Sequence, residues 1–122
     1  MDLGNTAKEL EALTQAESIV RRLADPQLLL KVQCNTVETE LAAGHLDRAA
    51  QRMNEVRELL ARTSHLSQEQ RIVCVHADAT LADARGDPAT AVARIETAIA
   101  LQEQMDRTDQ TYRSLLDRPS TV

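Results

Sequence analysis

The chain has 122 residues, of which 43% are hydrophobic, so it can bury a core and is too apolar to be disordered. Its net charge is −5 and no segment concentrates Arg or Lys beside aromatic residues, which argues against nucleic-acid binding. No apolar run approaches the ~20 residues of a membrane span, and the N-terminus lacks a signal-peptide pattern. We therefore expect a cytoplasmic protein that contacts neither membrane nor nucleic acid.

Apolar residues recur with the 3.6-residue period of a helix along the whole chain, and no stretch alternates as a strand would. The sequence therefore predicts an all-α protein with five long helices and a short C-terminal one. The connections between them are short, so consecutive helices are expected to be antiparallel neighbours. The predicted helices cover Thr6–Ala24, Pro26–Ala43, Leu46–Arg62, Ser67–Arg85, Pro88–Met105 and Gln110–Asp117.

Capping signals set most of these bounds. Thr6 followed three residues later by Glu9 fits a capping box, and Ser67 with Gln70 fits a second one. Asp25 precedes a proline, which together make a good N-cap and first helical residue. The polar run 106–109 is read as a turn before the last helix. We expect one domain over residues 1–117 and a flexible tail at 118–122.

The helix faces predict how deeply each element is buried. The third helix has one apolar and one charged face, as expected for packing on one side only. The fourth is apolar nearly all round and should be the most buried one, flanked on both sides. Apolar stripes are predicted on the first helix at Ala12, Ala16, Ile19 and Leu23, and on the fifth at Ala91, Ile95, Ala98 and Met105.

A motif of the form A-x-G-x4-A occurs twice, at Ala42-Ala43-Gly44 with Ala49, and at Ala84-Arg85-Gly86 with Ala91. The two copies lie 42 residues apart (86 − 44), and each joins two predicted helices. The pattern resembles the tetratricopeptide repeat, in which a small residue turns helix A into helix B and an alanine lets the two touch. The period is longer than the standard ~34 residues. It is similar to the long repeats that precede output domains in bacterial signalling proteins.

This resemblance covers about 80 of the 122 residues and implies both a fold and a function. The fold would be a short right-handed α-solenoid of stacked antiparallel hairpins. The function would be non-catalytic binding of a protein or peptide, as a scaffolding or sensory part of a signalling or regulatory protein. In the family, helix A side chains line the concave groove. The matching positions here are Lys31, Asn35, Glu38, Val73, His76, Thr80 and Asp83.

This groove assignment has an alternative, because the same seven positions could be ordinary solvated ones. His76 lies in an otherwise apolar helix, so it is either satisfied in the core or directed into the groove. Gln33, Thr36, Glu40 and Asp78 stand where the family has bulky residues. Two other overall interpretations stay open: an obligate homodimeric bundle, and a helical domain that senses a small molecule.

Catalytic and metal-site patterns are not found. The sequence has no G-x-S-x-G, no P-loop and no G-x-G-x-x-G, and its carboxylates fall on solvated faces. Cys74 and His76, at i and i+2, diverge on a helix and cannot share a metal. We expect no enzyme, no cofactor and no metal. Cys34 and Cys74 are predicted to be buried, unpaired thiols, because their offset of 40 differs from the repeat period of 42.

Overall fold

The computed structural model of the chain describes residues 3–116, and in that range it is all-α, as predicted, with no strand. The helices are α1 (Leu3–Leu23), α2 (Pro26–Ala42), α3 (Leu46–Arg62), α4 (Gln68–Ala84) and α5 (Pro88–Leu116). None of them combines the length and apolar character needed to cross a membrane within the described range. The expected tail at 118–122 lies outside the described residues.

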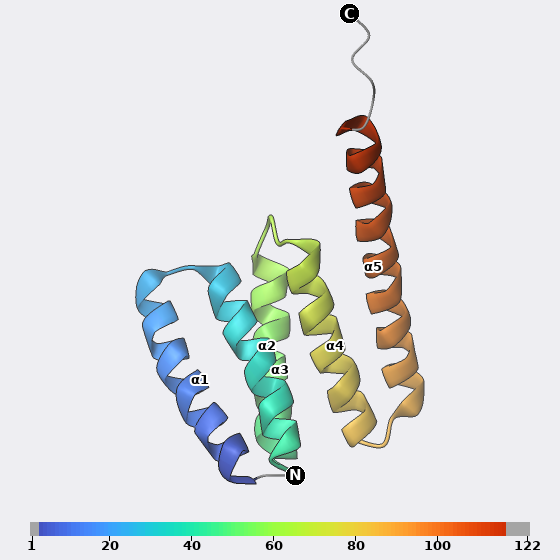
Figure 1. The fold of residues 1–122 in the computed structure, drawn as a ribbon. Coiled ribbons are helices and arrows are strands. Elements are labelled where there is room, and N and C mark those ends of the chain that lie inside the picture. The colour runs from blue at the N-terminus through green and yellow to red at the C-terminus, as the bar shows by residue number, and fades with distance from the viewer. Residues whose placement is uncertain (1–2, 117–122) are drawn as a thin grey trace, which may run out of the picture.

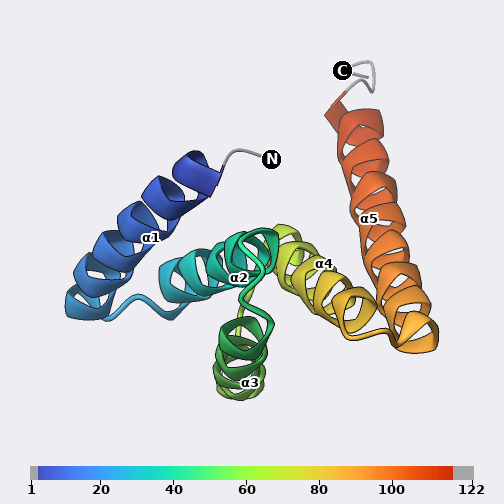
Figure 2. The same cartoon turned by 90° about the horizontal axis from the view of Figure 1, so that it is seen from below.

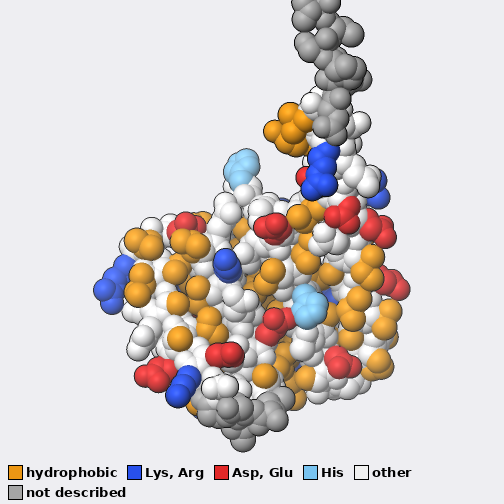
Figure 3. Space-filling view, viewed as in Figure 1, with side chains coloured by type: hydrophobic (Ala, Val, Ile, Leu, Met, Phe, Trp, Pro, Cys, Tyr) orange, Lys and Arg blue, Asp and Glu red, His pale blue; other side chains and the backbone are white. Residues whose placement is uncertain are grey.

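The helices run alternately up and down, and α2 and α4 lie side by side at the centre (Figure 1). α2 packs against α1, α3 and α4, whereas α5 packs against α4. Seen from below, α1 and α5 lean to one side of the α2–α4 layer and α3 lies on the other (Figure 2). We call the side without α3 the concave face. It is the face turned to the viewer in Figures 1 and 3.

The two copies of the sequence motif end their helices in the same way. At the first copy, the Gly44 N–H donates to the Leu41 carbonyl at 3.0 Å and the His45 N–H to the Glu40 carbonyl at 2.8 Å. At the second, Gly86 and Asp87 donate to the carbonyls of Asp83 and Ala82, both at 3.0 Å. Both glycines have positive φ, +81° and +75°, which a residue with a Cβ adopts at a cost. These are Schellman caps, and they turn α2 into α3 and α4 into α5.

The core lies where α2, α3 and α4 meet, and Leu30, Val37, Met53, Val56 and Leu81 are its largest fully buried aliphatic side chains. The two motif alanines are buried as predicted. Ala49 is 0% exposed and Ala91 is 5% exposed. A methyl group at these positions lets the paired helices approach each other closely.

Capping was predicted correctly at two helix starts and wrongly at one. The Asp25 carboxylate accepts hydrogen bonds from the N–H groups of Gln27 and Leu28 at the start of α2. The Ser67 hydroxyl accepts one from the Gln70 N–H at the start of α4, which makes Ser67 an N-cap, whereas the Gln70 side chain bonds to the Cys74 sulfur. Thr6 is not an N-cap, because α1 begins at Leu3 and continues through Gly4 and Asn5.

The predicted turn and separate last helix are wrong, because α5 continues without a break to Leu116. The run 106–109 is polar but contains no Gly or Pro, so nothing in it ends a helix. Local side-chain bonds support the continuation. Gln102 donates to Asp106 at 3.2 Å, and Arg113 pairs with Asp109 one turn away at 3.3 Å.

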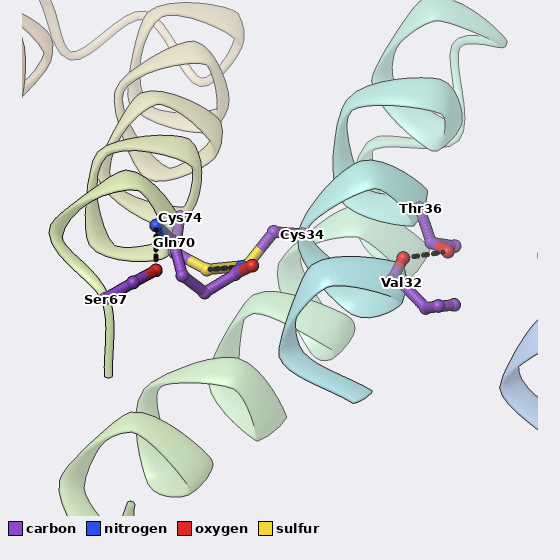
Figure 4. Close-up of a disulfide and its surroundings, with 6 residues drawn as sticks. All are labelled: Val32, Cys34, Thr36, Ser67, Gln70 and Cys74. Carbon is purple, nitrogen blue, oxygen red and sulfur yellow. Dashed lines mark hydrogen bonds between the residues drawn. A yellow bond between two sulfur atoms is a disulfide. The ribbon is translucent and has the colours of Figure 1, made fainter. Parts of the chain in front are cut away.

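The prediction of free thiols is also wrong. Cys34 of α2 and Cys74 of α4 form a disulfide with their Cα atoms 5.3 Å apart, and no free cysteine remains (Figure 4). Their burial was predicted correctly, with exposures of 0% and 1%. The offset of 40 does not keep them apart, because α2 and α4 pack directly against each other and the register of that contact is set by the core. Gln70 donates a hydrogen bond to the Cys74 sulfur at 3.4 Å.

The predicted apolar stripes on the two outer helices face solvent in large part. On α1, Val20 is buried, whereas Ile19 and Leu23 are exposed by 56% and 63%. On α5, Ile95 is 46% exposed although Ala91 beside it is buried. The reason is that the backbone of α1 packs against α2 alone and that of α5 against α4 alone, so much of each helix surface meets no partner within the described chain.

Candidate functional site

The concave face of α2 and α4 carries the seven residues that the sequence nominated for binding. Lys31, Asn35 and Glu38 are spaced four and three residues apart and therefore share one face of α2. The four positions on α4 have spacings of three, four and three and share a face in the same way. Lys31, His76 and Asp83 are exposed, whereas Asn35, Glu38, Val73 and Thr80 are half-buried.

His76 and Glu38 are brought together across the boundary between α2 and α4. The His76 Nδ1 lies 2.5 Å from the Glu38 Oε1, and the histidine side chain is 64% exposed. His76 is therefore directed to solvent on the concave face and is not in the core. Thr80 donates to the His76 carbonyl one turn back, so its hydroxyl is satisfied within α4.

A groove of about 600 Å³ lies between α2, α4 and α5. It takes in three of the seven nominated residues, Lys31, Asn35 and Val73. The other four, Glu38, His76, Thr80 and Asp83, do not line it. The groove residues are Gln27, Leu28, Lys31, Asn35, Ser67, Glu69, Gln70, Ile72, Val73, Gln102 and Met105.

The contribution of α5 to this site was not predicted from the sequence. Gln102 and Met105 form one wall of the groove, and the next turns of α5 form a second hollow of about 630 Å³ with the start of α4. We call this second hollow the notch. It is lined by Ser67, Gln68, Glu69, Met105, Asp106, Thr108, Asp109 and Tyr112. The absence of a helix breaker at 106–109 was the signal that could have revealed it.

Groove and notch are contiguous, because both are lined by Ser67, Glu69 and Met105. Their charges differ from one end to the other. Lys31 is the cation of the groove, whereas Glu69, Asp106 and Asp109 line the notch without any Lys, Arg or His. Hydrophobic side chains gather over the α1 side and over α5 on this face, with charged and neutral polar side chains between them (Figure 3).

The opposite side of the molecule carries a polar network that joins α1 to α3. Arg52 donates to both carboxylate oxygens of Glu17 at 3.1 Å, and Arg21 donates to the same carboxylate at 2.9 Å. Gln33, 2% exposed, donates to Glu17 and Glu55 at 3.4 Å each. Burial raises the pKa of Glu17, but Arg52 and the hydrogen bonds from Arg21 and Gln33 outweigh it, so the pKa is lowered.

This network explains part of the unusual composition of α2. Gln33, Thr36 and Glu40 occupy positions where bulky apolar residues were expected, and all three are buried. Thr36 donates to the Val32 carbonyl at 2.7 Å, and the Glu40 carboxylate lies 2.7 Å from the His45 Nδ1. Thr36 and Glu40 are thus bonded to neighbours, whereas the Gln33 side-chain oxygen, Oε1, is buried without a hydrogen-bond partner among the described residues.

Within residues 3–116 no three His, Cys, Asp or Glu side chains are placed to hold a metal ion. His45 and His76 are each paired with a glutamate, and Cys34 and Cys74 are paired with each other. The groups that remain at the groove and notch are carboxamides, carboxylates, the hydroxyls of Ser67, Thr108 and Tyr112, one ammonium group and apolar side chains. Such a set holds polar chains by hydrogen bonds and charge.

Comparison with family models, with curated protein sequences and with solved structures finds no match to this chain.

Proposed function

We propose that this chain is a non-catalytic domain that binds a protein segment or peptide along its concave face. In this proposal α2–α3 and α4–α5 are two tetratricopeptide-like hairpins of a short right-handed solenoid. Three features support it: the matching caps at Gly44 and Gly86, the buried alanines at 49 and 91, and the direct packing of α2 on α4.

The groove between α2, α4 and α5 is the observation that carries the proposal. It is open, elongated by the adjoining notch, and lined by Asn35 and Gln102 beside the apolar Val73 and Met105. A carboxamide both donates and accepts, so it can bond to either group of a peptide backbone. Apolar side chains between such groups take up the side chains of an extended segment.

The test is selection of phage-displayed random dodecapeptides on the immobilised protein, followed by fluorescence polarisation with the enriched peptides. Asn35→Ala combined with Gln102→Ala is expected to weaken binding about 10-fold or more, as two backbone-directed hydrogen bonds are lost. Gln51→Ala is the matched control, because Gln51 is an exposed carboxamide on α3, away from the concave face. Peptides that bind both variants as tightly as the native protein would contradict the proposal.

Self-association is a second candidate, and the exposed face of α5 favours it. Val92, Ile95 and Ile99 lie at i, i+3 and i+7 and are exposed by 54%, 46% and 51%. An apolar row of this kind is typical of a surface that another chain covers. Sedimentation velocity would show a dimer that Ile95→Glu with Ile99→Glu converts to a monomer. A monomeric native protein at about 100 μM would exclude this candidate.

The remaining expectations from the resemblance belong to the same proposal. A place in a bacterial signalling or regulatory protein would follow from the long repeat period, which is typical of regions that precede output domains. The cytoplasmic location also stays a prediction. The buried disulfide between Cys34 and Cys74 favours an oxidising compartment instead, since cytosolic thiols are normally kept reduced.

A further inference from the structure

The notch is a consequence of the unequal lengths of α4 and α5. α4 has 17 residues and α5 has 29, and the two are antiparallel partners. The first residues of α4, Ser67 to Glu69, share the notch with Met105 to Asp109. The last turns of α5 therefore stand clear of α4, as Figure 1 shows, and form a wall with no helix opposite it in the described chain.

The walls of the notch combine apolar and anionic groups. Met105 and Tyr112 supply the apolar part, and Glu69, Asp106 and Asp109 supply three carboxylates. Two of these carboxylates have partners that leave them accessible. Asp106 accepts from the neutral Gln102, and Asp109 pairs with Arg113 through side chains that are 59% and 74% exposed. An exposed pair of this kind is weak and is easily exchanged for another cation.

A lysine or arginine side chain matches this arrangement along its whole length. The aliphatic part of such a side chain packs on apolar surface, while its charged end stays near polar groups and water. Met105 offers that surface, and the ring of Tyr112 can also attract a cation over its face. The carboxylates then receive the charged end. An acidic residue at this place would meet like charge, and a purely apolar residue would gain no interaction with the carboxylates.

Notch and groove together offer a bound segment two regions of different charge. A segment that lies in the groove passes Lys31 on the α2 wall and reaches the acidic notch where α5 extends past the start of α4. The surface therefore carries a cation on the α2 side and three carboxylates at the notch. Complementary charge along a bound segment sets its direction and partner choice more than its affinity.

We propose that the segment bound by the groove places a lysine or arginine side chain in the notch. This inference rests on the proposed peptide-binding function and names the chemistry of its partner. The recognition comes from Met105 and Tyr112 along the aliphatic part and from Glu69, Asp106 and Asp109 at the charged end.

The experiment compares dodecapeptide selections on three proteins. The native protein is expected to enrich Lys or Arg at one peptide position at least 5-fold over the unselected library. Asp106→Asn with Asp109→Asn is expected to select binders without that enrichment. Glu96→Gln with Glu103→Gln is the matched control, because these are exposed carboxylates of α5 that do not line the notch, and it should keep the enrichment.

Fluorescence polarisation with the best peptide selected on the native protein separates the contribution of the positive charge to affinity from that of the aliphatic side chain. Replacing its basic residue by norleucine is expected to weaken binding to the native protein about 10-fold and binding to the Asp106→Asn/Asp109→Asn protein by less than 2-fold. Binders without basic enrichment would overturn the inference and leave the proposed function standing. Selections that yield no binders to the native protein would overturn both. Circular dichroism verifies that each variant is folded.

Discussion

At the scale of single residues, the role of the two cap glycines can be predicted from the local sequence, whereas the burial of the polar groups of α2 cannot. Gly44 and Gly86 adopt positive φ, and an added Cβ would meet no atom within 4 Å at either position. Their role is therefore conformational and not steric. Gln33, Thr36 and Glu40, by contrast, are buried only because α1, α3 and the α2–α3 turn supply neighbours for them. A local pattern reveals the glycines but not these polar groups.

The lowered pKa of Glu17 predicts a pH dependence of stability. A carboxyl group whose pKa is lower in the folded state stabilises the fold above its ordinary value of 4.5, and that contribution is lost as the pH falls through the folded-state pKa. Glu17→Gln is expected to lower the free energy of unfolding at pH 7 by about 1 kcal/mol or less, because the pair is partly exposed. The variant should also lose less stability than the native protein between pH 5 and pH 3.

Urea unfolding at several pH values measures this effect. Glu11→Gln is a control on the same helix, since Glu11 is exposed and has no ion pair among those found in the described residues. Parallel pH profiles for native protein and Glu17→Gln would show that the network with Arg52 does not contribute to stability.

At the scale of elements, the position of each helix in the array decides how much of it is buried. α2 and α4 have neighbours on several sides and bury six residues each. α5 is the longest helix, yet Ala91 is its one buried residue in the described chain. Only part of the apolar surface of α5 is therefore buried against other helices of this chain. Met105 lines the groove and the notch and Tyr112 lines the notch, whereas Val92, Ile95 and Ile99 are exposed outside both.

The close contact between α4 and α5 at Ala91 leads to a prediction about packing. Ala91→Leu is expected to cost about 1–3 kcal/mol, because three extra carbon atoms must fit where the helices touch. Ala100→Leu is the matched control on the same helix, at an exposed position, and should change stability by less than 0.5 kcal/mol. Thermal or urea unfolding measures both. Equal stability of the two variants would show that α4 and α5 do not approach closely at residue 91.

At the scale of the whole molecule, the disulfide is the covalent link between the two hairpins. α2 belongs to the first hairpin and α4 to the second, and the Cys34–Cys74 bond joins them inside the core (Figure 4). The bond closes a loop with a sequence separation of 40 residues. Such a link restricts the unfolded chain, and it also holds together the two helices that form the floor of the concave face.

Reduction of this bond is expected to lower the free energy of unfolding by about 2–4 kcal/mol. Urea unfolding with and without dithiothreitol measures the loss, and the Cys34→Ala/Cys74→Ala protein is the control, since its stability should not respond to the reductant. Mass spectrometry after alkylation in denaturant without reductant provides an independent check. Labelling of both cysteines under those conditions would show that the bond does not form.

The all-α class, most helix bounds, the two glycine caps and the burial of both motif alanines could be predicted from the sequence. These follow from short-range chemistry: helical periodicity, capping side chains and the tolerance of glycine for positive φ. Spacing along a helix also fixes that Lys31 and Asn35 share a face of α2, and both line the groove together with Val73 of α4.

The disulfide, the exposed apolar residues of α1 and α5, and the notch depend on how the helices pack in three dimensions. The pairing of Cys34 with Cys74 depends on the register between α2 and α4, and that register comes from core packing far apart in sequence. The exposure of Ile19 and Ile95 depends on α1 and α5 lying at the ends of the array, which no local pattern records. The notch exists because α5 is longer than α4 and extends past the start of α4. Asp106 and Asp109 of α5 therefore lie near Glu69 of α4 only in the folded chain. Helical periodicity shows which residues share a face, but only contacts between distant parts of the chain decide which faces are covered. Those contacts therefore decide where the groove lies and which charged residues line it.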